Sequence, residues 1–458
     1  KKDTVKFTRA MLPEKYIVDT RIDNMGYWKR MAQAGMVPVA PDAPAPGPVY
    51  KTSKIVAKGM AIGNSPDVPV TTNNTTQSEN SIFVDPSSAA VVVNSNNSTN
   101  YPSTGTVYGA DALNSADSAN TWAGTTQGPT GNNSGDPAVV INHSGRWFIG
   151  YINSGSGQSV AYSDNQGGNW TAKVVANAPS GFNNMLDKNH MWIDNSLSSP
   201  YSGNLYNAWT TFGGNSDGEI GVSRSTDAGL TWSPVTHVSS AANAGSHNQG
   251  VNIKTGPNGE VYVVWAIYDS WPSDEKAMAI ARSFDGGQTW LPATRIIDNL
   301  KGIRNHAVTQ NMRVNSFPSV AVDLSNGENR GNIYVVWTNV NTPGVNTGQG
   351  VEVYLIKSSD QGVTWSTPVK VNTDPLGTNK QHYLPWITCD PANGNIAIIF
   401  YDNRNVSASQ AEAWCAVSVD GAETFTDFAV SDVAFTPTPI PGLADGYMGD
   451  YLAIAAQD

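Results

Sequence analysis

The chain has 458 residues, enough for two or three average domains or for one long repeat architecture. Charged residues make up only 14% of it, while 43 Gly and 14 Trp favour turn-rich β-structure. The 27 Lys and Arg against 38 Asp and Glu give a formal charge of −11, which excludes nucleic acid as an expected partner and disfavours an anionic membrane.

Residues 1–48 have a pattern of their own. The amphipathic stretch 24–34 predicts a short helix that Asp23 caps and Gly35 ends. The Pro/Ala-rich run 38–48 predicts an extended strap or linker. Two roles stay open for this segment: a helix packed on the rim of the main domain, or a docking or propeptide-like element that binds a protein partner.

Residues 49–78 are interpreted as a linker or as ring-closing strands, because the β-like runs 49–51 and 53–57 could complete a ring of repeats. No stretch of the chain approaches the roughly 18 apolar residues that span a bilayer, so we expect no transmembrane segment. The start at Lys1-Lys2 lacks a signal-like apolar core, and any leader is expected to have been removed.

An octapeptide of the pattern Ser-x-Asp-x-Gly-x-Thr-Trp recurs along the rest of the chain. Three copies are complete, at 225–232, 283–290 and 358–365. Three weaker copies follow the pattern at 115–122, 163–170 and 418–425. The Asp-type positions are Asp117, Asn165, Asp227, Asp285, Asp360 and Asp420, and the aromatic positions are Trp122, Trp170, Trp232, Trp290, Trp365 and Phe425.

These residue types suit a structural clasp on a hairpin. A short Asp side chain accepts hydrogen bonds from the backbone N–H groups of its own turn, and Gly adopts a positive φ without steric cost. The aromatic ring then anchors the loop in the core, where an indole N–H requires a partner. We therefore assign the octapeptides a structural role and expect function elsewhere.

The spacing of the octapeptides predicts the architecture. Successive Asp-type positions are 48, 62, 58, 75 and 60 residues apart, and two β-like runs precede each copy while a third leads into it and a fourth follows. Four strands per period, repeated around an axis, predict a β-propeller over residues 79–458. Six blades start near residues 81, 136, 190, 250, 317 and 384, and a seventh start at 449–454 makes seven blades the favoured count over six.

The octapeptide series resembles the Asp boxes of the sialidase, or BNR-repeat, superfamily over about residues 79–458. This resemblance implies an all-β, sialidase-like propeller. It leaves activity open, because the superfamily includes sialidases, other glycan-active enzymes and proteins without known catalysis. The run Asn-Ser-Ile-Phe-Val-Asp-Pro at 80–86 and the start Ser-Gly-Asp-Pro-Ala-Val at 134–139 are similar to Asp-box propellers exported by Bacteroidetes-type bacteria, which implies a secreted or cell-surface location.

In an antiparallel four-stranded blade, the octapeptides share one face with the turns between first and second strands. The starts of the first strands lie on the opposite face, where we expect the site. The catalytic candidates there are His190, His247, Arg313, His382 and Tyr383. The ligand-binding candidates are Asp187, Asp269, Trp271, Asp402, Arg404 and Tyr447. Aromatic, acidic and imidazole groups around one concavity suit a sugar, although Asp136 and Asp450 would serve equally well to tie blades together.

Metal and disulfide chemistry receive little support. The separations of His190, His247 and His382, 57 and 135 residues, carry no local ligand spacing, so the metal stays unknown and no cofactor is required. A structural calcium held by carboxylates and carbonyls on the propeller axis is a further candidate. Cys389 and Cys415 fall on strands about 9.5 Å apart and are expected to be free thiols.

The resemblance narrows the activity further. Catalytic sialidases carry an arginine triad, a Tyr nucleophile helped by Glu, and an Arg-Ile-Pro motif. Here Arg21-Ile22-Asp23 lies outside the predicted propeller, and only Arg313 and Arg404 are available for a triad. Cleavage of sialic acid is therefore disfavoured. The hypothesis is a carbohydrate-directed propeller, either a hydrolase- or lyase-like enzyme or a binder of a glycan or polysaccharide; the alternative is a non-catalytic surface platform for adhesion or assembly.

Overall fold

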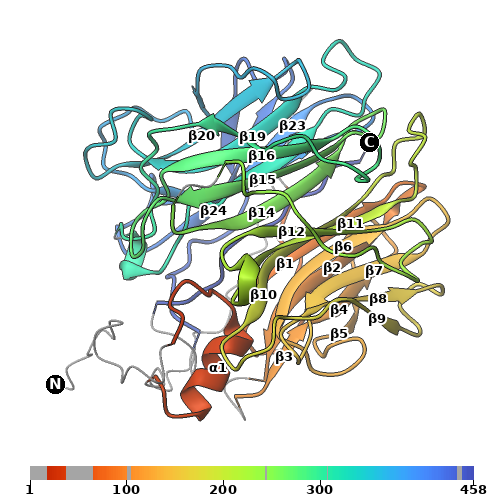
Figure 1. Cartoon of the computed structure of the whole chain (residues 1–458). Helices are drawn as coiled ribbons and strands as arrows, with labels where there is room; N and C mark the ends of the chain where they lie inside the picture. Colours follow the sequence, from red (N-terminus) through yellow and green to blue (C-terminus); the bar gives the residue numbers. More distant parts are fainter. Residues whose placement is uncertain are drawn as a thin grey trace.

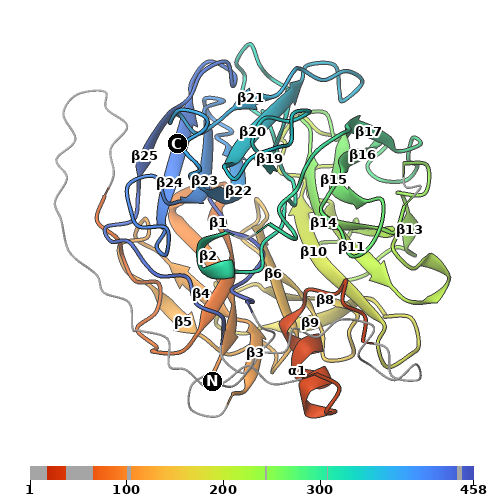
Figure 2. The same cartoon turned by 90° about the vertical axis from the view of Figure 1, so that its left-hand side faces the viewer.

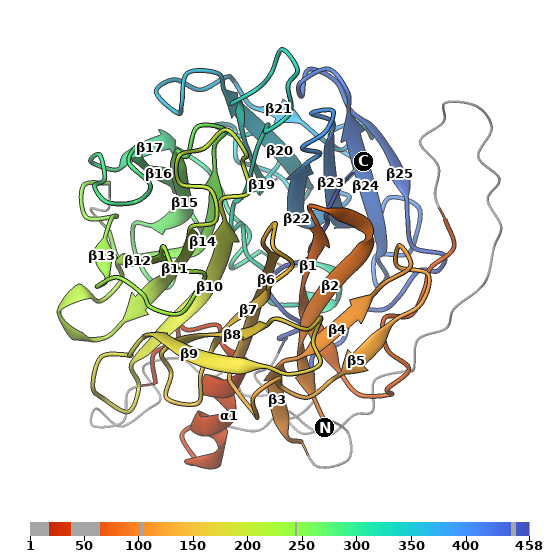
Figure 3. The same cartoon turned by 90° about the vertical axis from the view of Figure 1, so that its right-hand side faces the viewer.

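The computed structural model describes residues 18–37, 65–100, 105–242, 245–306, 308–440 and 446–457. Within them, six β-sheets surround a common axis, and each is built from four antiparallel strands that follow one another in the chain, with one extra strand in the first sheet (Figures 1, 2 and 3). The all-β propeller with four-stranded blades is thus confirmed. No helix among the described residues is long and apolar enough to cross a membrane.

The first three blades occupy residues 77–237. The first contains β1 (Gln77–Asp85), β2 (Ser88–Thr99), β4 (Ala112–Ser115) and β5 (Ala123–Thr125), with β3 (Val107–Ala110) paired to the end of β2. The second contains β6 (Gly135–Ile141), β7 (Trp147–Ile152), β8 (Gln158–Ser163) and β9 (Thr171–Ala176). The third contains β10 (Met185–Ile193), β11 (Leu205–Phe212), η3 (Gly214–Ser216), β12 (Ile220–Ser225) and β13 (Thr236–His237).

The last three blades occupy residues 247–429. The fourth contains β14 (His247–Thr255), β15 (Val261–Tyr268), β16 (Ala277–Ser283) and β17 (Thr294–Ile297). After η4 (Thr309–Asn311), the fifth contains β18 (Ser319–Val322), β19 (Ile333–Val340), β20 (Val351–Ser358) and β21 (Val369–Lys370). The sixth contains β22 (His382–Cys389), β23 (Ile396–Asp402), β24 (Glu412–Ser418) and β25 (Thr426–Ala429).

The core lies between neighbouring blades. The second strands β15 and β19 are buried along their whole length, because both faces of each blade pack against another blade. One apolar cluster, for example, joins Tyr206 of the third blade to Ile253, Val263 and Trp265 of the fourth. Fully burying such a side chain contributes about 1.5–3 kcal/mol. Branched and aromatic side chains pack well on the two buried faces of a blade, so runs rich in Val, Ile and Trp form strands here.

Five of the six first strands carry a β-bulge near their start. The register shifts in β1, β6, β10, β14 and β22, and the residues Glu79, Asp136, Lys188, Gly250 and Leu384 at these bulges have positive φ, between 51° and 73°. For the four that are not glycine this backbone is strained, by roughly 1–2 kcal/mol per residue. The bulges turn the first residues of these strands away from regular sheet pairing and toward the end of the axis.

The octapeptide loops share one hydrogen-bond pattern. In the third blade, Asp227 Oδ1 accepts from Ser225 Oγ at 2.8 Å and from Thr231 N at 2.9 Å, while its Oδ2 accepts from the Thr231 hydroxyl at 2.6 Å. In the fifth blade, the equivalent Thr364 hydroxyl lowers the pKa of Asp360 to about 2. The ring positions are half-buried, and the indole N–H groups of Trp232 and Trp365 have no partner among the described residues, contrary to the expectation that each would find one.

The expectation of seven blades is wrong, because the described residues form six. Residues 449–454 begin like a first strand but pair with no sheet. They instead run between the sixth and first blades, where the Tyr447 hydroxyl and the Asp450 N–H both donate to Glu79 Oε1, at 2.6 and 2.8 Å. The runs 49–51 and 53–57, considered as closing strands, lie outside the described residues.

The N-terminal helix is α1 (Met25–Gln33), shown in red beside β3 in Figures 1 and 3. Its N-cap is Asn24, whose Oδ1 accepts from Tyr27 N at 3.0 Å, so the assignment of the cap to Asp23 was wrong. The buried side chains Tyr27 and Met31 pack against Phe212 of the third blade. Cys389 and Cys415 are both free thiols, as expected.

Removing the Asp360 carboxylate tests the loop clasp. Asp360→Ala deletes the acceptor of two backbone and two hydroxyl bonds, and we expect the free energy of unfolding to fall by about 1–3 kcal/mol in urea denaturation. Asp360→Asn should cost less, since Asn165 in the second blade still accepts from Asn169 N at 2.8 Å. Equal stability of the Ala variant and the unchanged protein would contradict a structural role.

Candidate functional site

The face where the first strands start is covered by the chain's own N-terminal segment. Asp23 reaches the end of the axis with a side chain only 1% exposed, and it pairs with Arg304 at 2.5 Å and Arg313 at 2.6 Å. Gln249 Nε2 also donates to Asp23 Oδ2, at 3.1 Å. Burial by itself raises the pKa of Asp23, but the two guanidinium groups outweigh it and hold that pKa below its usual value. Asp23 is therefore a buried carboxylate between two arginines.

More carboxylates surround this ion pair. Arg313 also donates to Asp450 at 3.0 Å, Asn24 Nδ2 donates to Asp136 at 3.1 Å, and the Asp23 N–H donates to Asp187 at 3.0 Å. Burial raises the pKa of Asp136 and of Asp187 to about 7. Deeper on the axis, the Lys188 ammonium lies 3.3 Å from the centroid of the Tyr451 ring. The network closes this end of the axis.

Several sequence candidates take part in this closure instead of lining an open site. Asp187, Arg313 and Tyr447 bind the network just described. His247 is buried, stacks on Tyr268 at 4.4 Å, and has a pKa that burial lowers to about 3, so it is neutral. The Trp271 indole N–H donates to Thr20 Oγ1 at 2.9 Å, and Asp269 pairs with Arg295 at 2.9 Å.

His382 lies in a separate cluster between the fifth and sixth blades, with Asp402, Arg404 and two acids that the sequence did not single out. His382 Nδ1 donates to the Val351 carbonyl at 2.7 Å, and Nε2 lies 3.1 Å from Asp374 and 3.4 Å from Asp402. Burial lowers the pKa of His382, but Asp374, Asp402 and Glu352 more than reverse this, so the net pKa is raised. The surrounding carboxylates therefore favour the protonated, imidazolium form of His382.

Glu352, Asp374 and His382 also present ligand atoms within 4.8 Å of one another, and they are the group of described His, Cys, Asp and Glu residues that could hold a metal ion. Arg404 already pairs with Asp402 at 2.6 Å, and Lys370 lies 3.7 Å from Glu352. These cations neutralise part of the charge that a metal would require. The trio lies between the fifth and sixth blades, on β20, on the loop before β22 and on β22 itself, and not on the axis, where a calcium was considered.

Tyr383 does not join either cluster. It is fully buried among apolar side chains that include Val340 and Val351, and its ring lies 5.6 Å from that of Tyr401. Burial raises its pKa far above the usual value, which makes it a poor nucleophile. The expected single pocket lined by all five catalytic candidates is therefore wrong: His190 alone among them lines the large cavity described next.

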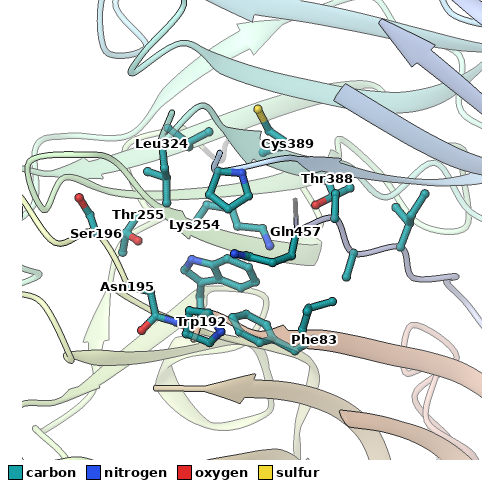
Figure 4. Close-up of a pocket in the computed structure, with 18 of the residues that line it drawn as sticks. Phe83, Trp192, Asn195, Ser196, Lys254, Thr255, Leu324, Thr388, Cys389 and Gln457 are labelled. Atoms are coloured by element: carbon teal, nitrogen blue, oxygen red, sulfur yellow. The ribbon is translucent and has the colours of Figure 1, made fainter. Parts of the chain in front are cut away.

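The large cavity lies on the axis and has a volume of about 400 Å³ (Figure 4). Residues of all six first strands line it, and residues 453–457 form one wall. Its aromatic side chains are Phe83 of β1, Trp192 of β10 and Trp386 of β22, each half-buried. A much smaller pocket, about 20 Å³, separates it from the closed end of the axis and is lined by Lys188 and Tyr451.

The cavity is on the octapeptide face. Its rim comes from turns between first and second strands, including Asn195, Ser196 and Ser198. These turns and the octapeptides lie together, as the hydrogen bond from Gln361 of one octapeptide to Glu260 beside the β14–β15 turn shows, at 3.4 Å. The expectation that the pocket faces away from the octapeptides thus does not describe the cavity that exists, because the N-terminal segment fills the other end.

The cavity walls carry positive and neutral polar groups. Lys254 and Arg330 line it, and none of its described lining residues is Asp or Glu. His190 Nδ1 accepts from Ile253 N at 3.2 Å, and burial lowers the pKa of His190 well below its usual value. His190 is therefore neutral with its proton on Nε2. Its ring lies parallel to Trp192, with centroids 6.2 Å apart, and 5.5 Å from Trp386.

No protein-family model and no curated protein sequence matches the chain. Among solved structures, it is similar to a protein of unknown function from Dyadobacter fermentans, with 14% identity and a TM-score of 0.44 over 75% of this chain and 94% of that one. It is also similar to NanB sialidase of Streptococcus pneumoniae, with 12% identity and a TM-score of 0.44 over 74% of this chain and 67% of that one. A third similar structure is Aleuria aurantia lectin in complex with a methyl fucoside, with 11% identity and a TM-score of 0.44 over 78% of this chain and 96% of that one. These similarities specify neither ligand nor activity; the sheets themselves define a six-bladed β-propeller with an axial cavity.

Breaking the ion pairs of Asp23 tests whether the N-terminal segment is integral to the propeller. Asp23→Asn leaves Arg304 and Arg313 buried without their shared carboxylate, and we expect a loss of about 3–5 kcal/mol in the free energy of unfolding. Asp19→Asn is the matched control, because Asp19 pairs with Arg21 nearer the surface and should cost under about 1 kcal/mol. Equal losses of unfolding free energy for the two substitutions would contradict an integral role for the N-terminal segment.

The His382 cluster predicts a pH dependence of stability. A raised folded pKa means that the imidazolium stabilises the fold fully below its unfolded pKa of about 6.5 and loses this contribution as the pH rises through the folded value. His382→Gln should therefore cost about 3 kcal/mol at pH 5.5 and less at pH 9. Urea denaturation of both proteins at the two pH values checks this, and an equal loss at both would contradict an imidazolium.

Proposed function

We propose that the protein binds carbohydrate in the axial cavity. The observation that carries this proposal is the set of three half-buried aromatic rings, Phe83, Trp192 and Trp386, facing one enclosed space. Flat apolar ring faces stack on sugar rings, and a few polar groups then fix the orientation of the ligand. The polar side chains of Asn195 and Ser196 lie at the rim of the same space, where they donate to the carbonyls of Ile141 and Pro257 at 2.8 and 2.6 Å.

The chemistry of the walls favours binding over hydrolysis. Glycoside hydrolysis ordinarily needs two carboxyl groups, about 5–5.5 Å apart for retention and about 6.5–9.5 Å apart for inversion. The described residues that line the cavity include neither Asp nor Glu. The carboxylates at the other end of the axis are bound to arginines, backbone N–H groups or Asn24, and the N-terminal segment covers them. The glycan-binding form of the hypothesis is therefore the one we advance.

The docking alternative receives no specific support. Tyr27 and Met31 of α1 are fully buried against the propeller, so this part of the N-terminal segment is not available as a free docking element. We place carbohydrate binding outside the cell or at its surface, because the first-strand runs 80–86 and 134–139 are similar to those of exported propellers.

Truncating one ring of the cavity tests the proposal. A glycan array first identifies a bound saccharide, and isothermal titration calorimetry then compares Trp386→Ala with the unchanged protein. We expect about 30-fold weaker binding, corresponding to about 2 kcal/mol for a buried Trp contact. Trp271→Ala, at the closed end of the axis, is the control and should leave affinity unchanged.

Two results would contradict the proposal. One is the absence of binding to any saccharide by protein whose thermal melting is normal. The other is loss of binding in Trp271→Ala with full binding in Trp386→Ala, which would place the ligand at the opposite face.

A further inference from the structure

Lys254 is the buried cation of the axial cavity. It lies near the end of β14, is only 9% exposed, and its ammonium nitrogen stands 2.9 Å from the centroid of the Trp192 ring. Figure 4 shows its side chain pointing into the same space as Phe83 and Trp192. In the described part of the chain, the Lys254 ammonium has no carboxylate partner and donates no hydrogen bond.

This isolation contrasts with the buried arginines at the other end of the axis. Arg304 and Arg313 each pair with Asp23, and Arg313 pairs with Asp450 as well. A buried ammonium without a partner costs several kcal/mol, so a protein ordinarily pairs it or leaves it neutral. In a chain with 38 acidic residues and a formal charge of −11, the described cavity walls nevertheless contain none of those acids. The partner of Lys254 is thus to be sought in the ligand.

His190 supplies a second donor in the same cavity. Its Nδ1 is occupied by the Ile253 N–H, so the proton of the neutral ring is on Nε2. No described residue accepts from that Nε2. His190 stands between Trp192 and Trp386, so its free N–H lies among the rings that would hold a sugar. Burial also lowers the pKa of Lys254 well below its usual value, and an anion beside it would restore the ammonium form.

We propose that Lys254 and His190 form an oxyanion-binding pair, so that the ligand of the cavity is an acidic saccharide. The inference rests on the proposed carbohydrate binding and restricts the ligand of the cavity from saccharides in general to acidic ones. The ammonium of Lys254 and the Nε2–H of His190 donate to one carboxylate or sulfate group, while Trp192 and Trp386 contact the sugar ring that carries it. Carboxylate and sulfate offer the same acceptor oxygens and negative charge, and the experiment separates them.

The test compares matched acidic and neutral ligands. Oligosaccharides that carry uronate or sulfate groups are arrayed beside their carboxyl-reduced and desulfated counterparts, and the hits are measured by isothermal titration calorimetry. We expect neutralising the acid to weaken binding 10- to 100-fold, the range for a hydrogen bond to a charged group. Lys254→Met should weaken acidic ligands by the same factor and neutral counterparts little. Lys254→Arg should retain a preference for acid, and the exposed Lys276→Met should change nothing.

The outcomes separate the inference from the function on which it rests. Equal binding of acidic and neutral counterparts by the unchanged protein, with binding still lost in Trp386→Ala, would overturn the acidic ligand and leave carbohydrate binding intact. Binding of neither class would overturn both. If Lys254→Met does not fold, the ratio of acidic to neutral affinity in the unchanged protein and its decrease with added salt decide the question without a variant. A preference for uronate over sulfate ligands, or the reverse, identifies the acidic group that Lys254 and His190 bind.

Discussion

The ion pairs of Asp23 with Arg304 and Arg313 determine how the centre of this propeller is used. Six first strands around an axis enclose a space that must be filled or left open at each end. At one end the carboxylate of Asp23 lies buried between the two arginines and brings residues 18–37 against the blades. Separating the partners of such a buried pair would leave a charge without its partner and strongly destabilise the fold. This end therefore stays closed in the folded protein. The cavity remains at the other end, on the octapeptide face.

Local features of the fold were predictable because they depend on residues close together in the chain. The bonds of Asp227 reach only from Ser225 to Thr231, so an eight-residue pattern specifies the loop. The helix at 25–33 was predictable for the same reason. Its cap was not, because Asp23 pairs with arginines nearly 300 residues away and Asn24 caps the helix instead. The blade count failed because residues 449–454 have the pattern of a first strand without a second strand to pair with.

The site was less predictable because it depends on contacts between distant residues. Position alone put Arg313 near a strand start, but it could not show that His190 lies beyond the bulge of β10, that Arg313 binds Asp23 or that His382 lies among Asp374 and Asp402. Trp192 and Trp386 lie two residues beyond the expected starts of their blades, and this shared position in β10 and β22 was a signal for an aromatic wall. The lack of a partner for Lys254 among the residues that the structure describes has no signature in the sequence.

A crystal structure of the protein with a bound oligosaccharide tests the central claim most directly. The account predicts one sugar ring against Trp192 and Trp386 in the axial cavity, with Asp23 still paired to Arg304 and Arg313 at the other end. A saccharide bound at the strand-start face, with residues 18–24 displaced from the arginines, would contradict it.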